Sequence, residues 1–268
     1  MTSITAELFS PGKYSDLLIK CKGKEFRVHR AVVCLQSKPL ADAIDGRFKE
    51  ATTGEIDLDG NELDIVECML QFMYNRDYSD GRDNDVGTTP STSLSVSVNT
   101  QGAPSSNSSL PSSGFTPTAK SLSEVKGALL TNTKVYIIGD QLQVPELKTL
   151  SMKKYEEVVS AGWNSASFVA SLKLLYEETM ENDRLLKDVV IKTAGEHVKD
   201  LCDRGEFVTL CKEKGEIAFD VLKASLTAEP SVTACPFCLQ LTNVSHSPPS
   251  QYQYYGRFYC SCCGRHFN

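Results

Sequence analysis

The sequence predicts an α+β fold in which helices pack with a small sheet, followed by an α-helical extension and a small cysteine-rich C-terminal module. Three observations support this prediction. Two short runs of apolar residues lie on either side of Gly23 and predict a pair of strands. Apolar residues recur at helical spacing through most of the later chain, up to residue 226. Five of the 10 cysteines lie in the last 34 residues.

Composition restricts the classes of function. The 268 residues include 41% hydrophobic and 23% charged residues, as in an ordinary globular protein, and the net charge is −6. A uniformly basic nucleic-acid-binding surface is therefore absent. No run approaches the roughly 18 apolar residues that a membrane-spanning helix needs. The N-terminal residues lack the pattern of a secretory signal, so we expect an intracellular protein, cytoplasmic or nuclear.

A β-hairpin is predicted first. Residues 17–22 and 24–29 are largely apolar or alternating and flank Gly23, so one face should be buried. Two short helices should follow. The second should begin near Pro39, because a proline in the first turn of a helix sacrifices no hydrogen bond. Its apolar face is formed by Leu40, Ala43 and Ile44.

A third strand and a longer helix should come next. The segment 54–60 (GEIDLDG) is expected to be a strand with Ile56 and Leu58 facing inward. Asn61 is expected to cap the helix that follows. The apolar residues of that helix recur at helical spacing and should bury one stripe: Leu63, Val66, Leu70 and Met73.

A segment without charge then interrupts the pattern. Residues 86–119 contain no Asp, Glu, Lys or Arg and are rich in Ser, Thr, Gly and Pro. Such a segment cannot bury enough apolar surface to offset the entropy lost on ordering. We therefore predict a disordered insert over residues 81–124.

Helical periodicity resumes near Leu129. We expect one helix to end near residues 139–143, a second to begin at Pro145, and a third to be capped by Asn164. Their apolar faces, and those of the helices that follow, do not contain paired polar residues of a catalytic kind. The sequence also lacks a phosphate-binding glycine loop, so an enzyme is not expected. The later inward-facing residues are predicted to be Phe168, Leu172, Leu175, Tyr176, Leu185, Leu186, Val189, Val190, Val198, Phe207, Leu210, Cys211, Ile217, Phe219, Val221 and Leu222.

The order of these residues resembles the BTB/POZ domain. The resemblance covers about 14–80 and 125–160, and the helices of 161–226 resemble the extension of fungal-type BTB proteins. The segments that match are Ser15-Asp16-Leu17, Phe26 to Arg30, Ser37 to Leu40, Phe48-Lys49-Glu50, Glu55 to Leu58, Met73-Tyr74, Val135 to Asp140 and Val144 to Leu147.

This resemblance implies a non-enzymatic adaptor that binds proteins, with a homodimer and a cullin scaffold of ubiquitin ligases as family-typical partners. Phe48 and Glu50 match the hydrophobic-x-Glu motif associated with cullin binding. The alternative is that Phe48 packs into the core. Asp16 and Arg30 match the family's charged pocket pair. The alternative is that Asp16 caps or pairs locally at the entrance of the first strand.

The C-terminal cysteines form two C-x-x-C elements, Cys235 with Cys238 and Cys260 with Cys263. Four thiolates at this spacing can surround one tetrahedral Zn²⁺, and the module, residues 227–268, resembles a zinc ribbon. Because four cysteine ligands leave no open coordination position, the zinc would be structural. Cys262 could replace Cys263, with His266, in a shifted register. Reduced or redox-active thiols are the remaining interpretation.

A second class of function is a nuclear regulator that contacts nucleic acid or chromatin proteins through the zinc ribbon. Interleaved aromatic residues favour it. However, Arg257 and Arg265 are the only basic residues there, and a four-thiolate zinc site is net negative, so nucleic acid is not the favoured partner. No small-molecule substrate is indicated. The other cysteines are predicted to be buried and reduced: Cys21, Cys34, Cys68, Cys202 and Cys211.

Overall fold

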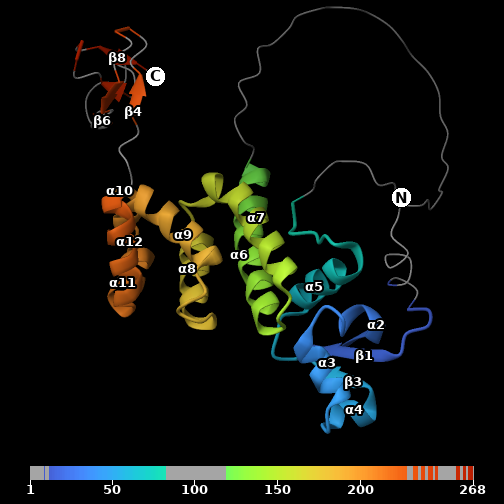
Figure 1. The fold of residues 1–268 in the computed structure, drawn as a ribbon. Helices are drawn as coiled ribbons and strands as arrows, with labels where there is room; N and C mark the ends of the chain where they lie inside the picture. The colour runs from blue at the N-terminus through green and yellow to red at the C-terminus, as the bar shows by residue number, and fades with distance from the viewer. Residues whose placement is uncertain are drawn as a thin grey trace, which may run out of the picture. The chain divides into compact units, whose positions relative to one another are not determined.

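The computed structural model describes Phe9, residues 12–82, residues 119–227 and short stretches of the C-terminal module (232–234, 237–238, 241–243, 245–246, 258–259, 262–263 and 265–267). The chain divides into two compact units, Met1–Leu174 and Leu175–Asn268. Figure 1 shows the elements of each unit with their labels. Most of the predicted insert, residues 83–118, lies outside the described residues.

The first unit contains a three-stranded sheet of order β2-β1-β3, made by β1 (Leu17–Cys21), β2 (Lys24–Val28) and β3 (Glu55–Asp57). Strands β1 and β2 are antiparallel, with Ile19 opposite Phe26, whereas β3 runs parallel to β1. The turn between β1 and β2 has positive φ angles at Lys22 (48°) and Gly23 (79°), as a two-residue type I′ hairpin requires. The predicted hairpin about Gly23 is confirmed.

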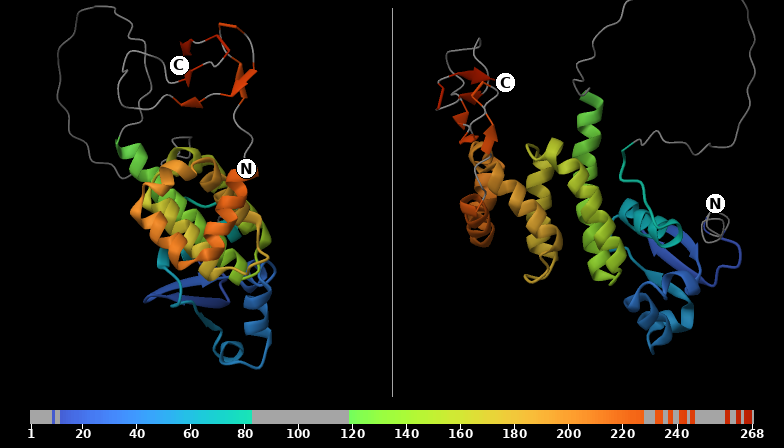
Figure 2. Two further views of the ribbon diagram at one scale, coloured as in Figure 1. Left: turned by 90° about the vertical axis from the view of Figure 1, so that its left-hand side faces the viewer. Right: turned by 45° about the horizontal axis from the view of Figure 1, so that its top comes forward.

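The helices of the first unit surround this sheet and extend away from it. Ser37 caps α3, because its Oγ accepts a hydrogen bond from the Leu40 N–H at 3.3 Å, and Pro39 occupies the first turn as predicted. Helices α6 and α7 lie side by side as a helical hairpin (Figure 2). The bounds are α2 (Arg30–Val33), α3 (Lys38–Asp45), α4 (Lys49–Thr53), α5 (Leu63–Asn75), α6 (Ala119–Gln141), α7 (Pro145–Gly162) and α8 (Ala166–Glu178), whose end belongs to the second unit.

The two parts of the first unit on either side of the predicted insert share one hydrophobic core. Helix α5 buries Val66, Leu70 and Met73 of its predicted stripe, whereas Leu63 is half-buried. It buries a second face as well, because it packs between the sheet-side helices and α6. Residues of α6 and α7 join the same core as those of β1 and α5. The core residues that lie after the predicted insert are Val135, Ile138, Val144 and Leu147.

The predicted cap of α5 is wrong. Glu62, and not Asn61, is the N-cap residue, and no side chain caps this helix. The Asn61 N–H bonds back to the Leu58 carbonyl oxygen at 2.9 Å, so the chain completes a turn before the helix begins. The Glu62 carboxylate binds the Lys134 ammonium of α6 at 2.6 Å instead.

The predicted cap of α8 is displaced by one residue. The Oγ of Ser165 accepts the Phe168 N–H at 3.2 Å, a role predicted for Asn164. Serine and asparagine are comparable N-cap residues. Residue type alone therefore does not decide whether Asn164 or Ser165 caps the helix.

The edges of the predicted insert are also corrected. Helix α6 begins at Ala119, which is inside the predicted range of 81–124. At the other edge, Gly81 and Arg82 are ordered, since the Arg82 guanidinium binds Asp80. Arg82 also bonds to Glu157 of α7, a contact that the composition of this segment does not reveal.

The second unit is helical, with α9 packed along α12. A Cβ added at Gly195 of α9 would lie 2.7 Å from the Ala224 Cβ of α12, so glycine permits this close approach. The buried residues include Leu186, Val190, Phe207, Leu210, Ile217 and Val221, as predicted. The prediction that Phe219 and Leu222 face inward is wrong, because they are 67% and 55% exposed. The helices are α9 (Leu185–Glu196), α10 (Val198–Cys202), α11 (Gly205–Glu213) and α12 (Gly215–Thr227).

Short strands follow α12. The described strands form a pair, β4 with β5, and a three-stranded sheet of order β6-β7-β8. Their bounds are β4 (Val232–Ala234), β5 (Leu241–Asn243), β6 (Ser245–His246), β7 (Phe258–Tyr259) and β8 (His266–Phe267). In the described parts of the chain, no helix is both long and apolar enough to cross a membrane.

Candidate protein-docking surface

Phe48 projects from the tight turn between α3 and α4. Its side chain is 68% exposed, so it does not pack into the core. A Cβ added at Gly46 would lie 2.6 Å from the Asp42 carbonyl oxygen and 3.1 Å from the Phe48 ring. The turn therefore needs glycine at position 46, and the ring lies against that glycine. An exposed aromatic ring in a constrained turn is a suitable anchor for a protein partner.

Glu50 lies two residues further, in the first turn of α4, and is half-buried. Helix α4 ends at Gly54, whose N–H bonds to the Glu50 carbonyl oxygen at 2.8 Å. Gly54 has a φ of 66°, a left-handed conformation that leads directly into β3. Within the described residues, no hydrogen bond or ion pair engages the Glu50 carboxylate, so it can accept a bond from a partner.

Asp16 and Arg30 are brought together, but as a helix cap. The Asp16 Oδ1 accepts a hydrogen bond from the Arg30 backbone N–H at 2.8 Å, at the start of α2. A carboxylate suits this position because the first N–H groups of a helix have no partner within the helix. Across the described residues, no ion pair joins the two side chains, and the buried Arg30 Nε has no hydrogen-bond partner. Asp16 thus caps the first turn of α2, and the role of Asp16 and Arg30 as a charged pocket stays a prediction.

The segment after the predicted insert supports α3. Ser37 is fully buried, and its Oγ donates to the Leu142 carbonyl oxygen at 2.7 Å. Leu142 lies in the turn between α6 and α7, where Gln143 has a φ of 51°. The same hydroxyl accepts the Leu40 N–H, so it links this turn to the first turn of α3.

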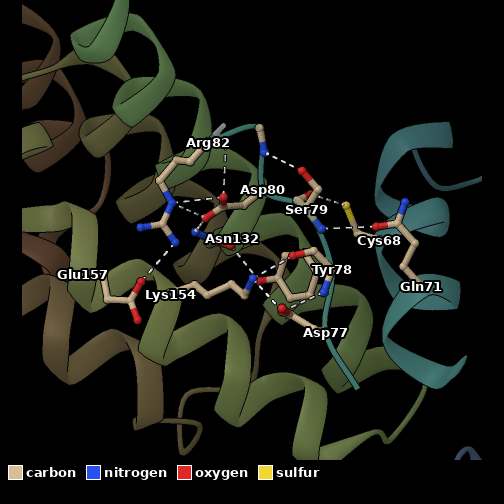
Figure 3. Close-up of polar contacts among 11 residues, drawn as sticks. Cys68, Gln71, Asp77, Tyr78, Ser79, Asp80, Arg82, Asn132, Lys154 and Glu157 are labelled. Atoms are coloured by element: carbon tan, nitrogen blue, oxygen red, sulfur yellow. Dashed lines mark hydrogen bonds and ion pairs between the residues drawn. The ribbon is translucent and has the colours of Figure 1, made fainter. Parts of the chain in front are cut away.

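A buried polar cluster ties residues 77–82 to α6 and α7 (Figure 3). Asp80 is 4% exposed, and the Arg82 Nε donates to its two oxygens at 2.9 and 3.0 Å. Asn132 of α6 donates to the same carboxylate at 2.9 Å. Arg82 also reaches Glu157 of α7 at 3.1 Å. Burial alone would raise the pKa of Asp80, but the hydrogen bonds from Arg82 and Asn132 outweigh it and lower that pKa.

Lys154 of α7 joins the same cluster. Its Nζ donates to the Tyr78 carbonyl oxygen at 2.7 Å, pairs with Asp77 at 2.7 Å, and lies 4.6 Å from the centre of the Tyr78 ring. The Tyr78 hydroxyl donates to the Asn132 Oδ1 at 2.6 Å. Burial raises the pKa of Tyr78. Because each member is bonded to another, the cluster acts as a structural clamp.

The sequence signal for this clamp is the presence of polar residues at core positions of helices. Asn132 and Lys154 occupy helix positions that bury their side chains, at 0% and 9% exposure. Their partners lie some 52 and 76 positions away along the chain, so no local motif reveals the pairing.

A comparison with protein-family models identifies the first part of the chain. Residues 5–89 match the family model of the BTB/POZ domain. The protein contains a BTB/POZ domain. A search of curated proteins found no match.

The match places both Phe48 and Glu50 inside the BTB/POZ domain. BTB/POZ domains are protein-interaction modules and are generally non-enzymatic. The matched residues end before α6, but α6 and α7 complete the same core. The hydrophobic core that contains the matched residues therefore includes chain from both sides of the predicted insert, and the assignment of residues 125–160 to the BTB/POZ domain stays a prediction.

The C-terminal cysteines are described only in part. Cys238 and Cys263 each lie in a turn, whereas Cys235 and Cys260 lie outside the described residues. Among the residues that are described, no group of three His, Cys, Asp or Glu could hold a metal. The guanidinium carbon of Arg265 lies 5.1 Å from the centre of the Phe237 ring. The zinc site stays a prediction.

The isolated cysteines differ in exposure. Cys21 and Cys68 are buried as predicted, and burial raises the pKa of the Cys68 thiol to about 12. Cys34 and Cys211 are half-buried. The prediction for Cys202 is wrong, because it is exposed at the C-terminal end of the short helix α10.

Proposed function

We propose that the protein is an adaptor whose BTB/POZ domain docks a cullin scaffold through Phe48 and Glu50. The observation that supports this is the exposure of the Phe48 ring in a turn that Gly46 constrains. Such a ring enters a partner's pocket with little further loss of conformational freedom. The helices of residues 161–226 would then be the fungal-type extension of the adaptor and supply a second docking surface.

The two side chains would play different roles. Burying a Phe side chain contributes roughly 1.5–3 kcal/mol. The Glu50 carboxylate would accept hydrogen bonds from the partner and so favour one orientation. Phe48 and Glu50 are only two residues apart. A single pocket on the partner, with a hydrogen-bond donor at its rim, would therefore accommodate both side chains.

Binding of full-length protein to a panel of purified cullin N-terminal domains tests this proposal. Phe48→Ala should weaken binding by about 30-fold, the effect of losing a hot spot of about 2 kcal/mol, and Glu50→Ala by less. Tyr14→Ala is the matched control, because Tyr14 is also exposed, at 76%, and lies outside the α3–α4 turn. Absence of binding by the unmodified protein to every cullin would reject the cullin part of the proposal.

We also infer that the C-terminal module binds a structural zinc ion. Ala234 of β4 pairs with Leu241 of β5, and Tyr259 of β7 pairs with His266 of β8. The connections are therefore residues 235–240 and 260–265, which are equal in length.

Each connection has cysteine at its first and fourth positions, which are Cys235, Cys238, Cys260 and Cys263. The contact between Phe237 and Arg265 supports a close approach of the two connections. In this alignment Cys262 corresponds to Phe237, which favours Cys263 as the fourth ligand. Four thiolates would hold Zn²⁺ and stabilise a module with few aliphatic residues.

Zinc content of the purified full-length protein tests this inference. We expect about one zinc per chain, retained in Cys262→Ser and lost in Cys263→Ser. Loss in Cys262→Ser with retention in Cys263→Ser would establish the shifted register. A chain without zinc would reject the site. A gel-shift titration with DNA and RNA tests the alternative of a nuclear regulator that contacts nucleic acid. That alternative requires the protein to retard the nucleic acid in a salt-sensitive way, whereas a purely structural zinc ion does not.

A further inference from the structure

Residues 50–75 carry negative charge without a basic residue among them. This stretch contains seven Asp or Glu residues and no Lys or Arg. Its Ser and Thr hydroxyls are those of Thr52 and Thr53, at the C-terminal end of α4. Kinases distinguish their substrates by the charges around the acceptor hydroxyl, so this pattern suits a kinase that selects acidic sequences. The carboxylates that follow the two threonines most closely are Glu55, Asp57 and Asp59.

The two hydroxyls differ in their hydrogen bonding. The Thr53 Oγ1 donates to the Lys49 carbonyl oxygen at 3.2 Å and accepts the Glu55 N–H at 3.3 Å. Thr52 is exposed, and within the described residues no hydrogen bond engages its hydroxyl. Thr52 is therefore the available acceptor, and Glu55 stands at the third position after it.

Helix α4 can open without disturbing the core. It is five residues long and contains no buried residue. A helix this short has little stability of its own, and β-branched residues such as threonine weaken it further. Elements with few buried contacts open locally at a low cost in free energy. The segment can thus adopt the extended conformation that a kinase active site requires while the sheet and α5 stay folded.

We propose that Thr52 is a phosphorylation site for a serine/threonine kinase that selects acidic sequences. In this reaction the Thr52 Oγ1 attacks the γ-phosphorus of ATP, the bond from that phosphorus to the ADP oxygen breaks, and the hydroxyl proton passes to the base of the kinase. The product carries an added charge of about −1.5 to −2 at neutral pH. The carboxylates of Glu55 and Asp57 are the groups that a basic substrate groove would bind.

Phosphorylation would regulate the docking turn, a consequence that rests on the proposed function. Thr52 lies in the last turn of α4, where the helix dipole is negative, so the phosphate opposes the helix. The carboxylates of Glu50 and Glu55 add like charge nearby. Opening of α4 breaks the bond from the Gly54 N–H to the Glu50 carbonyl oxygen and releases Phe48, the N-cap residue. We therefore expect the phosphorylated protein to dock more weakly.

Kinase treatment of the full-length protein tests the site. The protein would be incubated with ATP and a kinase that selects an acidic residue at the third position after the acceptor, and mass spectrometry would locate the phosphate. We expect phosphate on Thr52 and none at position 52 of Thr52→Ala. Glu55→Gln should reduce the rate of modification by about tenfold, the effect of losing one charge-assisted hydrogen bond.

Two other threonines serve as matched controls in the same experiment. Thr193 also has glutamate at the third position after it, Glu196, but Thr193 is buried in α9. Thr209 is exposed but has Lys212 at that position. Neither should be modified. A lack of phosphate on Thr52, or modification of either control as rapid as that of Thr52, would overturn the proposal.

Hydrogen exchange and cullin binding test the regulatory consequence. Phosphorylation should speed exchange of the Gly54 amide and weaken cullin binding, each by about fivefold or more. Unchanged exchange, or unchanged binding despite faster exchange, would contradict regulation of the docking turn. If the unmodified protein binds no cullin, the docking proposal fails, whereas phosphate on Thr52 and faster exchange at Gly54 would still support the modification site.

Discussion

The Ser37 hydroxyl donates a hydrogen bond of 2.7 Å to the Leu142 carbonyl oxygen across 105 positions of the chain. This bond joins the first turn of α3 to the turn between α6 and α7. The first unit is thus held together at this point by two segments on opposite sides of the predicted insert. Its proposed docking turn lies at the other end of the same α3 helix.

Removal of this hydroxyl should destabilise the domain. Ser37→Ala leaves the partly buried Leu142 carbonyl and the buried Leu40 N–H without their partner, at a cost of about 1–3 kcal/mol. Urea unfolding followed by circular dichroism measures the loss. Thr52→Ala, at an exposed position of α4, is the control and should change the free energy of unfolding by less than about 0.5 kcal/mol. Equal stability of Ser37→Ala and the unmodified protein would contradict the role of this bond.

The sequence predicts the local features of the fold well. The hairpin at Gly23, Pro39 in the first turn of α3 and the buried stripe of α5 all follow from residue type and spacing within a few positions. The clamp of Asp80 and Asn132 could not be predicted, because the partners are far apart along the chain. Phe219 and Leu222 show a different limit. Apolar residues predict that a helix face packs against a neighbour. They do not predict which of the two apolar faces of α12 packs within the same chain.

The Asp80 clamp should make stability depend on acidity. The pKa of Asp80 is lowered from its ordinary value of 3.8, so its stabilising contribution is complete above that value and is lost as pH falls through the lowered pKa. Asp80→Asn removes this contribution. The difference in unfolding free energy between the two proteins should be largest near neutral pH and shrink below about pH 4. Urea unfolding at several pH values measures it.

A matched substitution separates this effect from a general loss of negative charge. Asp45→Asn changes the same chemical group at an exposed position, so its effect should vary little with pH. A pH-independent difference for Asp80→Asn would show that hydrogen bonding by the carboxylate does not stabilise the clamp.

Gly46 should be required for the geometry of the docking turn. Gly46→Ala places a Cβ 2.6 Å from the Asp42 backbone oxygen, and that contact cannot be relieved by rotating a side chain. The turn must open, which should cost about 1–3 kcal/mol and displace the Phe48 ring. Gly60→Ala is the control, because a Cβ there meets nothing within 4 Å. If the docking proposal holds, Gly46→Ala weakens partner binding and Gly60→Ala does not; equal stability of the two variants would contradict the steric argument.

The composition of residues 83–118, which lie outside the described part of the chain, predicts that proteases cut there first. Trypsin is unsuitable, because residues 86–119 contain neither Lys nor Arg, so proteinase K should be used at low concentration. We expect an early nick in this segment, after which the two fragments remain associated, because Met69 and Leu70 of one fragment share a core with Val135 and Ile138 of the other. Size-exclusion chromatography should elute them together, and urea should separate them. First cuts in α6 or α7, or fragments that separate without denaturant, would contradict a folded domain that closes across the predicted insert.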